Sequence, residues 1–164
     1  MSDYDLALID RYRKAGVLVD TNLLLLYFVG LYDPTFIPKF KRTDIFTMDD
    51  YLVLTLFLKE FSRVVTTPNI LTEVNSFSNQ LPENLKPDYY AKFARGIAAL
   101  EEIYMPSRDI SISLLFGLFG LTDAGIFLTS KDTFLVLTDD RRLSAYLNAS
   151  GVDAINFNHL RTYL

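Results

Sequence analysis

Short apolar runs alternate along this chain with longer segments that have the residue spacing of helices. The runs "VLV" at 17–19 and "TFLVLT" at 133–138 are apolar over successive positions, which is typical of central parallel strands covered on both faces. β-Branched residues fill most of "RVVTT" at 63–67, which favours a third strand. A final strand at "VDAINF", 152–157, and a short edge strand at 103–105 complete the predicted sheet.

Capping signals mark where several predicted helices begin and end. Ser2 and Thr47 each precede acidic residues in what would be a first helical turn, and Pro68 begins another segment. These features are typical of helix starts, and Gly16 and Gly151 follow two of the segments as helix-ending glycines. The predicted helices cover residues 3–14, 23–31, 48–61, 68 to beyond 73, 90–100, 107 to a break near 117–120, 121–128 and 139–150.

The alternation of strands and helices determines the predicted fold class. Strands that are separated by helices imply right-handed βαβ crossovers, and hence an α/β fold whose mostly parallel sheet carries helices on both faces. The chain has 164 residues, of which half are hydrophobic, so it can bury a substantial core as one domain, residues 1–164.

Composition excludes several kinds of chemistry. The chain contains no cysteine, which excludes disulfides, thiolate metal sites and cysteine nucleophiles. Its longest apolar run, Leu23 to Val29, is far shorter than the roughly 20 residues that span a bilayer, and the first residues do not resemble a signal peptide. We therefore expect a soluble, cytoplasmic protein without membrane contact. The net charge of −4 argues against a domain that holds nucleic acid by overall charge.

Acidic residues follow the predicted strands at one edge of the sheet. Asp20 comes directly after the strand at 17–19, and Asp139 and Asp140 come after the strand at 133–138. Ligands of such sheets bind at the carboxyl ends of the strands. Alone, Asp20 is adequately explained as a helix N-cap. Glu73, near the start of one helix, and Asp123, at the predicted start of another, can reach the same edge.

Several acids at one place repel one another and raise each other's pKa values. A hard divalent cation, Mg²⁺ or Mn²⁺, relieves this repulsion with carboxylate ligands, and a chain with no cysteine and one histidine suits these ions better than zinc. When four acids are set aside, the remaining 16 equal the 16 basic residues, so the negative excess is local to the predicted site. These four acids are Asp20, Glu73, Asp123 and Asp140.

Four short motifs together resemble the PIN-domain ribonucleases, a family that includes the VapC-type toxins of toxin–antitoxin systems. They are, in chain order, "LVDTNLLL", "TPNILTEV", "GLTDAGI" and "LVLTDDRRL". Each motif is short, but their order, spacing and strand or helix context are more specific than any one alone. The resemblance implies a three-layer αβα sandwich with a core at about 16–158, to which the first helix is an addition.

The resemblance also implies a metal site. It implies that Asp20, Glu73 and Asp123 bind Mg²⁺ or Mn²⁺ and that Asp140 completes the site, with Asp139 as the alternative fourth acid. The residues implied to support the site by hydrogen bonds are Thr21, Asn22 and Thr138. The implied activity is hydrolysis of phosphodiester bonds in single-stranded RNA by a metal-bound water. A protein inhibitor (antitoxin) and a homodimer are the implied protein partners.

Two other functions are compatible with parts of this pattern. A PIN-like module that no longer cuts would bind RNA or protein, although the presence of all the acids argues against lost catalysis. A phosphatase or phosphotransferase would use Asp20 itself as the nucleophile. The dehalogenase-like pattern for that chemistry fails here, because Asn22 stands where a second aspartate is required.

Three basic features have an ordinary interpretation beside a functional one. The segment Lys39 to Arg42, "KFKR", lies near phenylalanines and either contacts RNA or forms a solvated loop. Arg141 and Arg142 follow the fourth acid and either contact phosphate or form local ion pairs. His159 lies outside every motif, and we interpret it as a surface or capping residue.

Overall fold

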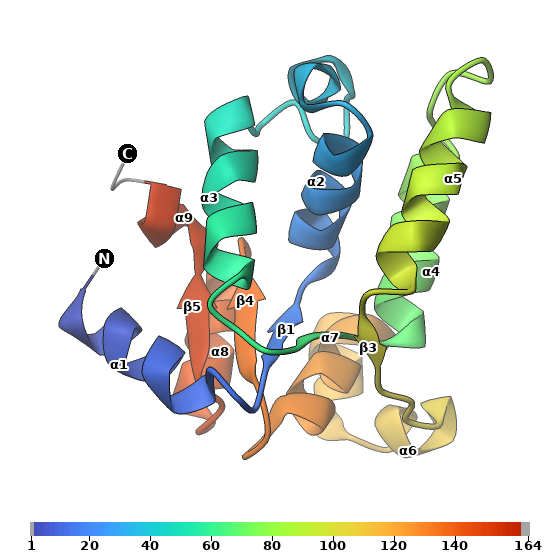
Figure 1. Ribbon diagram of the computed structural model, residues 1–164. Coiled ribbons are helices and arrows are strands. Elements are labelled where there is room, and N and C mark those ends of the chain that lie inside the picture. The colour runs from blue at the N-terminus through green and yellow to red at the C-terminus, as the bar shows by residue number, and fades with distance from the viewer. Residues whose placement is uncertain (1, 162–164) are drawn as a thin grey trace.

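The computed structural model describes residues 2–161, which form an α/β fold around a five-stranded, entirely parallel sheet (Figure 1). The strand order is β3-β2-β1-β4-β5, so β1 lies at the centre. The strands are β1 (Val17–Val19), β2 (Val64–Thr66), β3 (Glu101–Glu102), β4 (Leu135–Thr138) and β5 (Ala154–Asn156).

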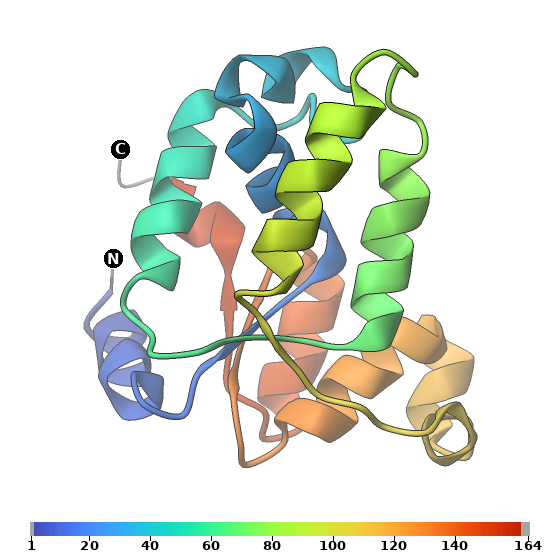
Figure 2. The ribbon, with the colours of Figure 1, turned by 45° about the vertical axis from the view of Figure 1, so that its right-hand side comes forward.

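Helices cover both faces of the sheet and make a three-layer αβα sandwich (Figures 1 and 2). In one layer α2 packs against α3, α4 and α5, and α7 and α8 contact β4. The helices are α1 (Asp3–Tyr12), α2 (Thr21–Tyr32), the 3₁₀ helix η1 (Pro34–Lys39), α3 (Met48–Leu58), α4 (Pro68–Ser78), α5 (Lys86–Ile97), α6 (Ser107–Ser111), α7 (Leu114–Ser130), α8 (Arg141–Ala149) and α9 (Phe157–Leu160).

The strands predicted within 17–19, 63–67, 133–138 and 152–157 are confirmed as β1, β2, β4 and β5, and the predicted edge strand is displaced. The prediction of a strand at 103–105 is wrong, because the strand lies at Glu101–Glu102, paired with Val65 and Thr66 of β2. The register of the neighbouring strand β2 determines this pairing. Beyond β3, the predicted segment 103–105 makes one further backbone hydrogen bond to β2, from the Ile103 N–H to the Thr66 carbonyl at 2.9 Å.

The predicted helix starts at Ser2 and Thr47 are confirmed as capping boxes. In each, the hydroxyl accepts from the backbone three residues later, and an aspartate side chain accepts from the cap backbone. The helix predicted from Ser107 is wrong in its extent, because it ends at Ser111 and Ser113 caps a new helix, α7. The predicted break near 117–120 is confirmed, since α7 is interrupted at Gly120 with φ +82°. The short helix α9 was not predicted.

The segment around Asp20 is among the most deeply buried in the molecule. The strand β1 and the leucines 23–26 of α2 are all 0% exposed, because α2 lies between the sheet and its neighbouring helices. Each fully buried leucine contributes about 1.5–3 kcal/mol through the hydrophobic effect. The turn that carries Asp20 is therefore held rigidly at both of its ends.

Among residues 2–161, none of the helices combines the length and the apolar character that crossing a membrane requires.

Candidate functional site

Asp20 occupies the end of β1 and is the N-cap of α2, with a side chain that is 7% exposed. One carboxylate oxygen accepts from the Thr21 N–H at 2.6 Å, and the other accepts from the Thr138 hydroxyl at the end of β4. The capping role expected of an isolated aspartate is thus real. The contact with β4 goes beyond capping, since it fixes the carboxylate between two neighbouring strands.

The surroundings of Asp20 disfavour its charged form. Burial raises the pKa of Asp20 to about 7, and the negative charges of Asp123 and Asp139 raise it further against the opposing effect of its hydrogen bonds. At neutral pH an appreciable fraction of this carboxyl is therefore protonated when no cation is present. Such a group gains more from a nearby cation than an exposed aspartate does.

Glu73 is held in the second turn of α4 by two threonine hydroxyls. Thr21 of α2 donates to one carboxylate oxygen at 2.8 Å, and Thr122 of α7 donates to the other at 2.6 Å. The carboxylate therefore joins three helices that are far apart in sequence. Thr122 was not predicted as a site residue, and the only signal was its position directly before Asp123 in "LTDAG".

Asp123 lies one residue beyond Thr122, where α7 resumes after Gly120. Burial raises its pKa to about 6, with further contributions from the charges of Glu73 and Asp140. Asp123 is thus within electrostatic reach of acids on α4 and at the start of α8, and it also acts on Asp20. It is the residue that connects the two sides of the acid cluster.

Asp139 and Asp140 follow β4 and have different contacts. The Asp140 carboxylate caps α8 by accepting from the Arg142 and Leu143 N–H groups at 2.7 and 3.0 Å. Asp139 accepts from the Asn22 side chain at 3.3 Å, and burial raises its pKa above the usual range. Both acids lie at the same edge as Asp20. Both capping bonds of Asp140 go to the same carboxylate oxygen, whereas Asn22 donates to both oxygens of Asp139.

The three residues expected to support the site each donate a hydrogen bond to one of these acids. Thr21 donates to Glu73, Asn22 to Asp139 and Thr138 to Asp20. The Thr138 hydroxyl also accepts from the Asp140 N–H at 3.0 Å, so that it links two acids. Asn158 of α9 was not predicted; its side chain donates to the Asp139 carbonyl at 2.8 Å.

The acids influence one another electrostatically: the charges of Asp123 and Asp139 act on Asp20, and those of Glu73 and Asp140 act on Asp123. They do not form a closed coordination sphere: over residues 2–161, no three acidic or histidine side chains stand together as ready ligands of one ion. The donor atoms that these residues offer are carboxylate oxygens, the ligand type that Mg²⁺ and Mn²⁺ prefer. The residues therefore offer the donor atoms that such an ion prefers, but their present spacing does not form a site for it.

The basic features near the site differ in what they contact. Phe40, within "KFKR", and Phe46, beyond it, are buried and do not offer stacking surfaces, and the Arg42 side chain donates to the Gln80 side chain. Arg142 lies over the Phe119 ring, 4.9 Å from its centroid. Of the two alternatives for Arg141 and Arg142, phosphate contact or local ion pairs, the ion pairs are not formed within residues 2–161.

Comparison with known proteins adds no relative to this picture. The chain matches no family model, and it matches no curated protein in sequence.

Proposed function

We propose that this protein is a Mg²⁺- or Mn²⁺-dependent endoribonuclease of the PIN-domain type, which hydrolyses phosphodiester bonds of single-stranded RNA. One observation supports the proposal: acids from four separate segments, Asp20, Glu73, Asp123, Asp139 and Asp140, lie within electrostatic reach of one another, and the pKa values of Asp20, Asp123 and Asp139 are raised by burial and by neighbouring carboxylates. If these acids had only a structural role, their burial and mutual repulsion would lower the stability of the fold without compensation. A bound cation would compensate this repulsion.

The cation would be held by Asp20, Asp123 and Asp140, with Glu73 on the α4 side and Asp139 beside Asn22. When bound, it would supply a water of lowered pKa as the nucleophile and offset charge on the phosphoryl oxygens. This chemistry requires no nucleophilic side chain, which agrees with a chain that has no cysteine.

The side chains themselves contribute orientation. Glu73 is fixed by two hydroxyl donors, and Asp20 by a hydroxyl and a backbone N–H. Carboxylates held in this way keep their direction as a cation or a phosphate approaches, so that little reorganisation is required at the reacting centre. Thr138 connects Asp20 to the Asp140 backbone, which couples the ends of β1 and β4.

The same geometry argues against Asp20 as a covalent nucleophile. Both of its oxygens accept hydrogen bonds, and the side chain is 7% exposed. A phosphoryl acceptor has to offer one oxygen to an incoming phosphorus atom. Hydrolysis by water is therefore the better-supported reaction.

The test is cleavage of a labelled single-stranded RNA by the purified protein, with Mg²⁺, with Mn²⁺ and with EDTA. We expect cleavage only with a divalent cation, and at least a hundredfold slower cleavage by Asp20→Asn. Asp44→Asn is the matched control, because Asp44 is an exposed turn residue remote in sequence from the motifs. Equal cleavage by the wild type and Asp20→Asn would identify a contaminating nuclease and overturn the proposal.

A further inference from the structure

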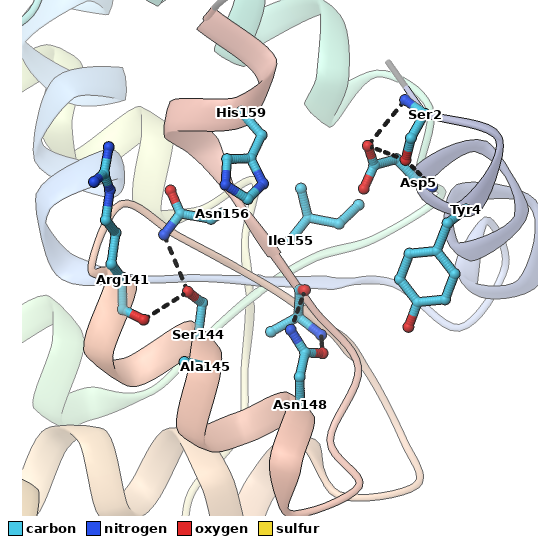
Figure 3. A pocket seen from close by; sticks show the side chains of 11 residues that line it. Ser2, Tyr4, Asp5, Arg141, Ser144, Ala145, Asn148, Ile155, Asn156 and His159 are labelled. Atoms are coloured by element: carbon cyan, nitrogen blue, oxygen red, sulfur yellow. Dashed lines mark hydrogen bonds between the residues drawn. The ribbon is translucent and has the colours of Figure 1, made fainter.

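A cavity of about 490 Å³ lies at the outer edge of β5, beside the end of the sheet that carries the acids (Figure 3). Its volume is in the range of about 300–1,000 Å³ that is typical of small-ligand sites. The walls come from α1, α8, β5 and α9. The lining includes Tyr4, Arg141, Ser144, Ile155, Asn156 and His159.

Hydrogen bonds tie one wall of this cavity to the acid cluster. The Asn156 side chain donates to the Ser144 hydroxyl at 3.0 Å and accepts from the Asn158 side chain at 2.9 Å. Asn158 in turn donates to the Asp139 carbonyl. Arg141, on the same wall, directly follows Asp140 in the chain. A ligand in the cavity would therefore lie in a fixed position relative to the acids.

The cavity is lined by one acidic residue, Asp5, and one arginine, Arg141, which differ in what they contact. Asp5 is occupied by its capping box, in which it accepts from the Ser2 N–H at 3.1 Å and the Ser2 hydroxyl at 2.7 Å. The Arg141 side chain is exposed and makes no hydrogen bond or ion pair with any residue from 2 to 161. A guanidinium of this kind is well suited to bind a phosphate group.

The other surfaces favour a planar ring. Ile155 lies between Tyr4 and Asn156 in Figure 3, and the Tyr4 side chain is 60% exposed. Nucleobases of single-stranded RNA characteristically stack on exposed aromatic side chains. An exposed aromatic ring and an exposed arginine thus line the same cavity, whereas Ile155 between Tyr4 and Asn156 is 2% exposed.

A peptide added to the sheet edge is a poorer match for this cavity. The backbone groups that Ala154 turns outward from β5 are already satisfied, because its N–H donates to the Asn148 side chain and its carbonyl accepts from it, both at 3.0 Å. Strand addition requires such groups to be available. The cavity therefore favours a ligand that is recognised through side chains.

We propose that this cavity is a subsite for the RNA strand next to the nucleotide whose phosphodiester is cut. A base of the strand packs on Tyr4 at one end of the cavity, and a phosphate of the strand binds Arg141 at the other end (Figure 3). This inference rests on the proposed ribonuclease function. It also gives α1, the addition to the PIN-like core, a role in holding the substrate.

The test measures RNA binding by fluorescence anisotropy with Mg²⁺ in the Asp20→Asn background, where cleavage is suppressed. We expect Tyr4→Ala to weaken binding about tenfold and Tyr4→Phe to leave it within about twofold, because the ring is kept. Arg141→Ala should weaken binding about tenfold and reduce the slope of log affinity against log salt by about 0.7. Thermal unfolding of each variant checks that the fold is unchanged.

Two matched controls separate the cavity from its surroundings. Leu6→Ala removes an exposed apolar side chain from the same helix but outside the cavity, and Arg95→Ala removes an exposed positive charge on α5, which precedes the opposite edge strand. Both should bind RNA like the parent. If Tyr4→Ala and Arg141→Ala also bind like the parent while the wild type cleaves RNA, the subsite is overturned and the ribonuclease stands. If the wild type neither binds nor cleaves RNA, both proposals fall.

Discussion

At the scale of single residues, threonine hydroxyls determine how the acids are arranged. Thr21, Thr122 and Thr138 each donate to a carboxylate, and Thr138 is 0% exposed. Sequence reasoning found the acids because strand ends in a parallel sheet meet at one edge. It found two of these threonines through their motifs and missed Thr122, because a hydroxyl partner on another helix leaves no local pattern in the sequence.

Replacement of Thr138 by valine tests the importance of such a hydroxyl. The two side chains have nearly the same shape, but valine leaves the Asp20 oxygen and the Asp140 N–H without their partner. We expect the free energy of unfolding to fall by about 1–3 kcal/mol, measured by urea denaturation. Thr72→Val is the control, because the Thr72 hydroxyl bonds only its own helix at an exposed position, and it should change stability by less than about 0.5 kcal/mol.

The raised pKa of Asp20 predicts a particular pH dependence of stability in EDTA. Because the folded pKa is about 7 and the ordinary value is 3.8, the contribution of this group is fully present below about pH 4 and is lost as the pH rises through 7. The upper bound of that loss is about 4 kcal/mol. Asp20→Asn keeps the N-cap but cannot ionise, so it should unfold at a higher temperature than the wild type at pH 8.

The same comparison at pH 5 supplies the control. There the wild-type carboxyl is largely protonated, so the advantage of Asp20→Asn over the wild type should shrink or reverse. Thermal unfolding followed by circular dichroism at both pH values, in EDTA, measures the difference. An advantage that is the same at pH 5 and pH 8 would show that burial of the Asp20 charge does not limit stability.

At the scale of elements, local signals predicted most of the fold. Capping boxes at Ser2 and Thr47 and the apolar strands gave the correct elements, because these features act within a few residues of the backbone they stabilise. The two-residue strand β3 was displaced, since its place depends on pairing with β2. The cavity beside β5 was not predicted, because α1 and α8, which line it, lie at opposite ends of the chain.

The interruption of α7 at Gly120 gives an element-scale prediction. Its backbone, with φ +82° and ψ −175°, is a conformation that side chains with a Cβ rarely adopt. The interruption also sets where Thr122 and Asp123 begin the second part of the helix. Gly120→Ala should therefore destabilise the protein by about 1–3 kcal/mol and slow RNA cleavage.

Gly117→Ala is the matched control in the same helix. Gly117 is helical, and a Cβ added there would meet no atom within 4 Å, so alanine should leave stability unchanged or raise it by about 0.5–1 kcal/mol. Urea denaturation and cleavage rates of the two variants measure the contrast. Equal effects of the two substitutions would mean that the α7 interruption does not position Asp123.

At the scale of the whole molecule, the uneven charge couples folding to cation binding. Apart from the four acids assigned to the motifs, acidic and basic residues balance, so the repulsion relieved by a cation is concentrated where β1, α4, α7 and α8 meet. A cation that binds only the folded state should raise the unfolding temperature. At a cation concentration of a hundred times its dissociation constant, it stabilises the folded state by about 2.7 kcal/mol. Titration of the wild type with Mg²⁺ or Mn²⁺ should therefore give a saturable rise, which Asp123→Asn should largely abolish and Asp44→Asn should retain. A rise of equal size in Asp123→Asn would show that the cation binds elsewhere on the molecule. If the unfolding temperature of the wild type did not rise at all, the acid cluster would not be a cation site, and its charge would be unexplained.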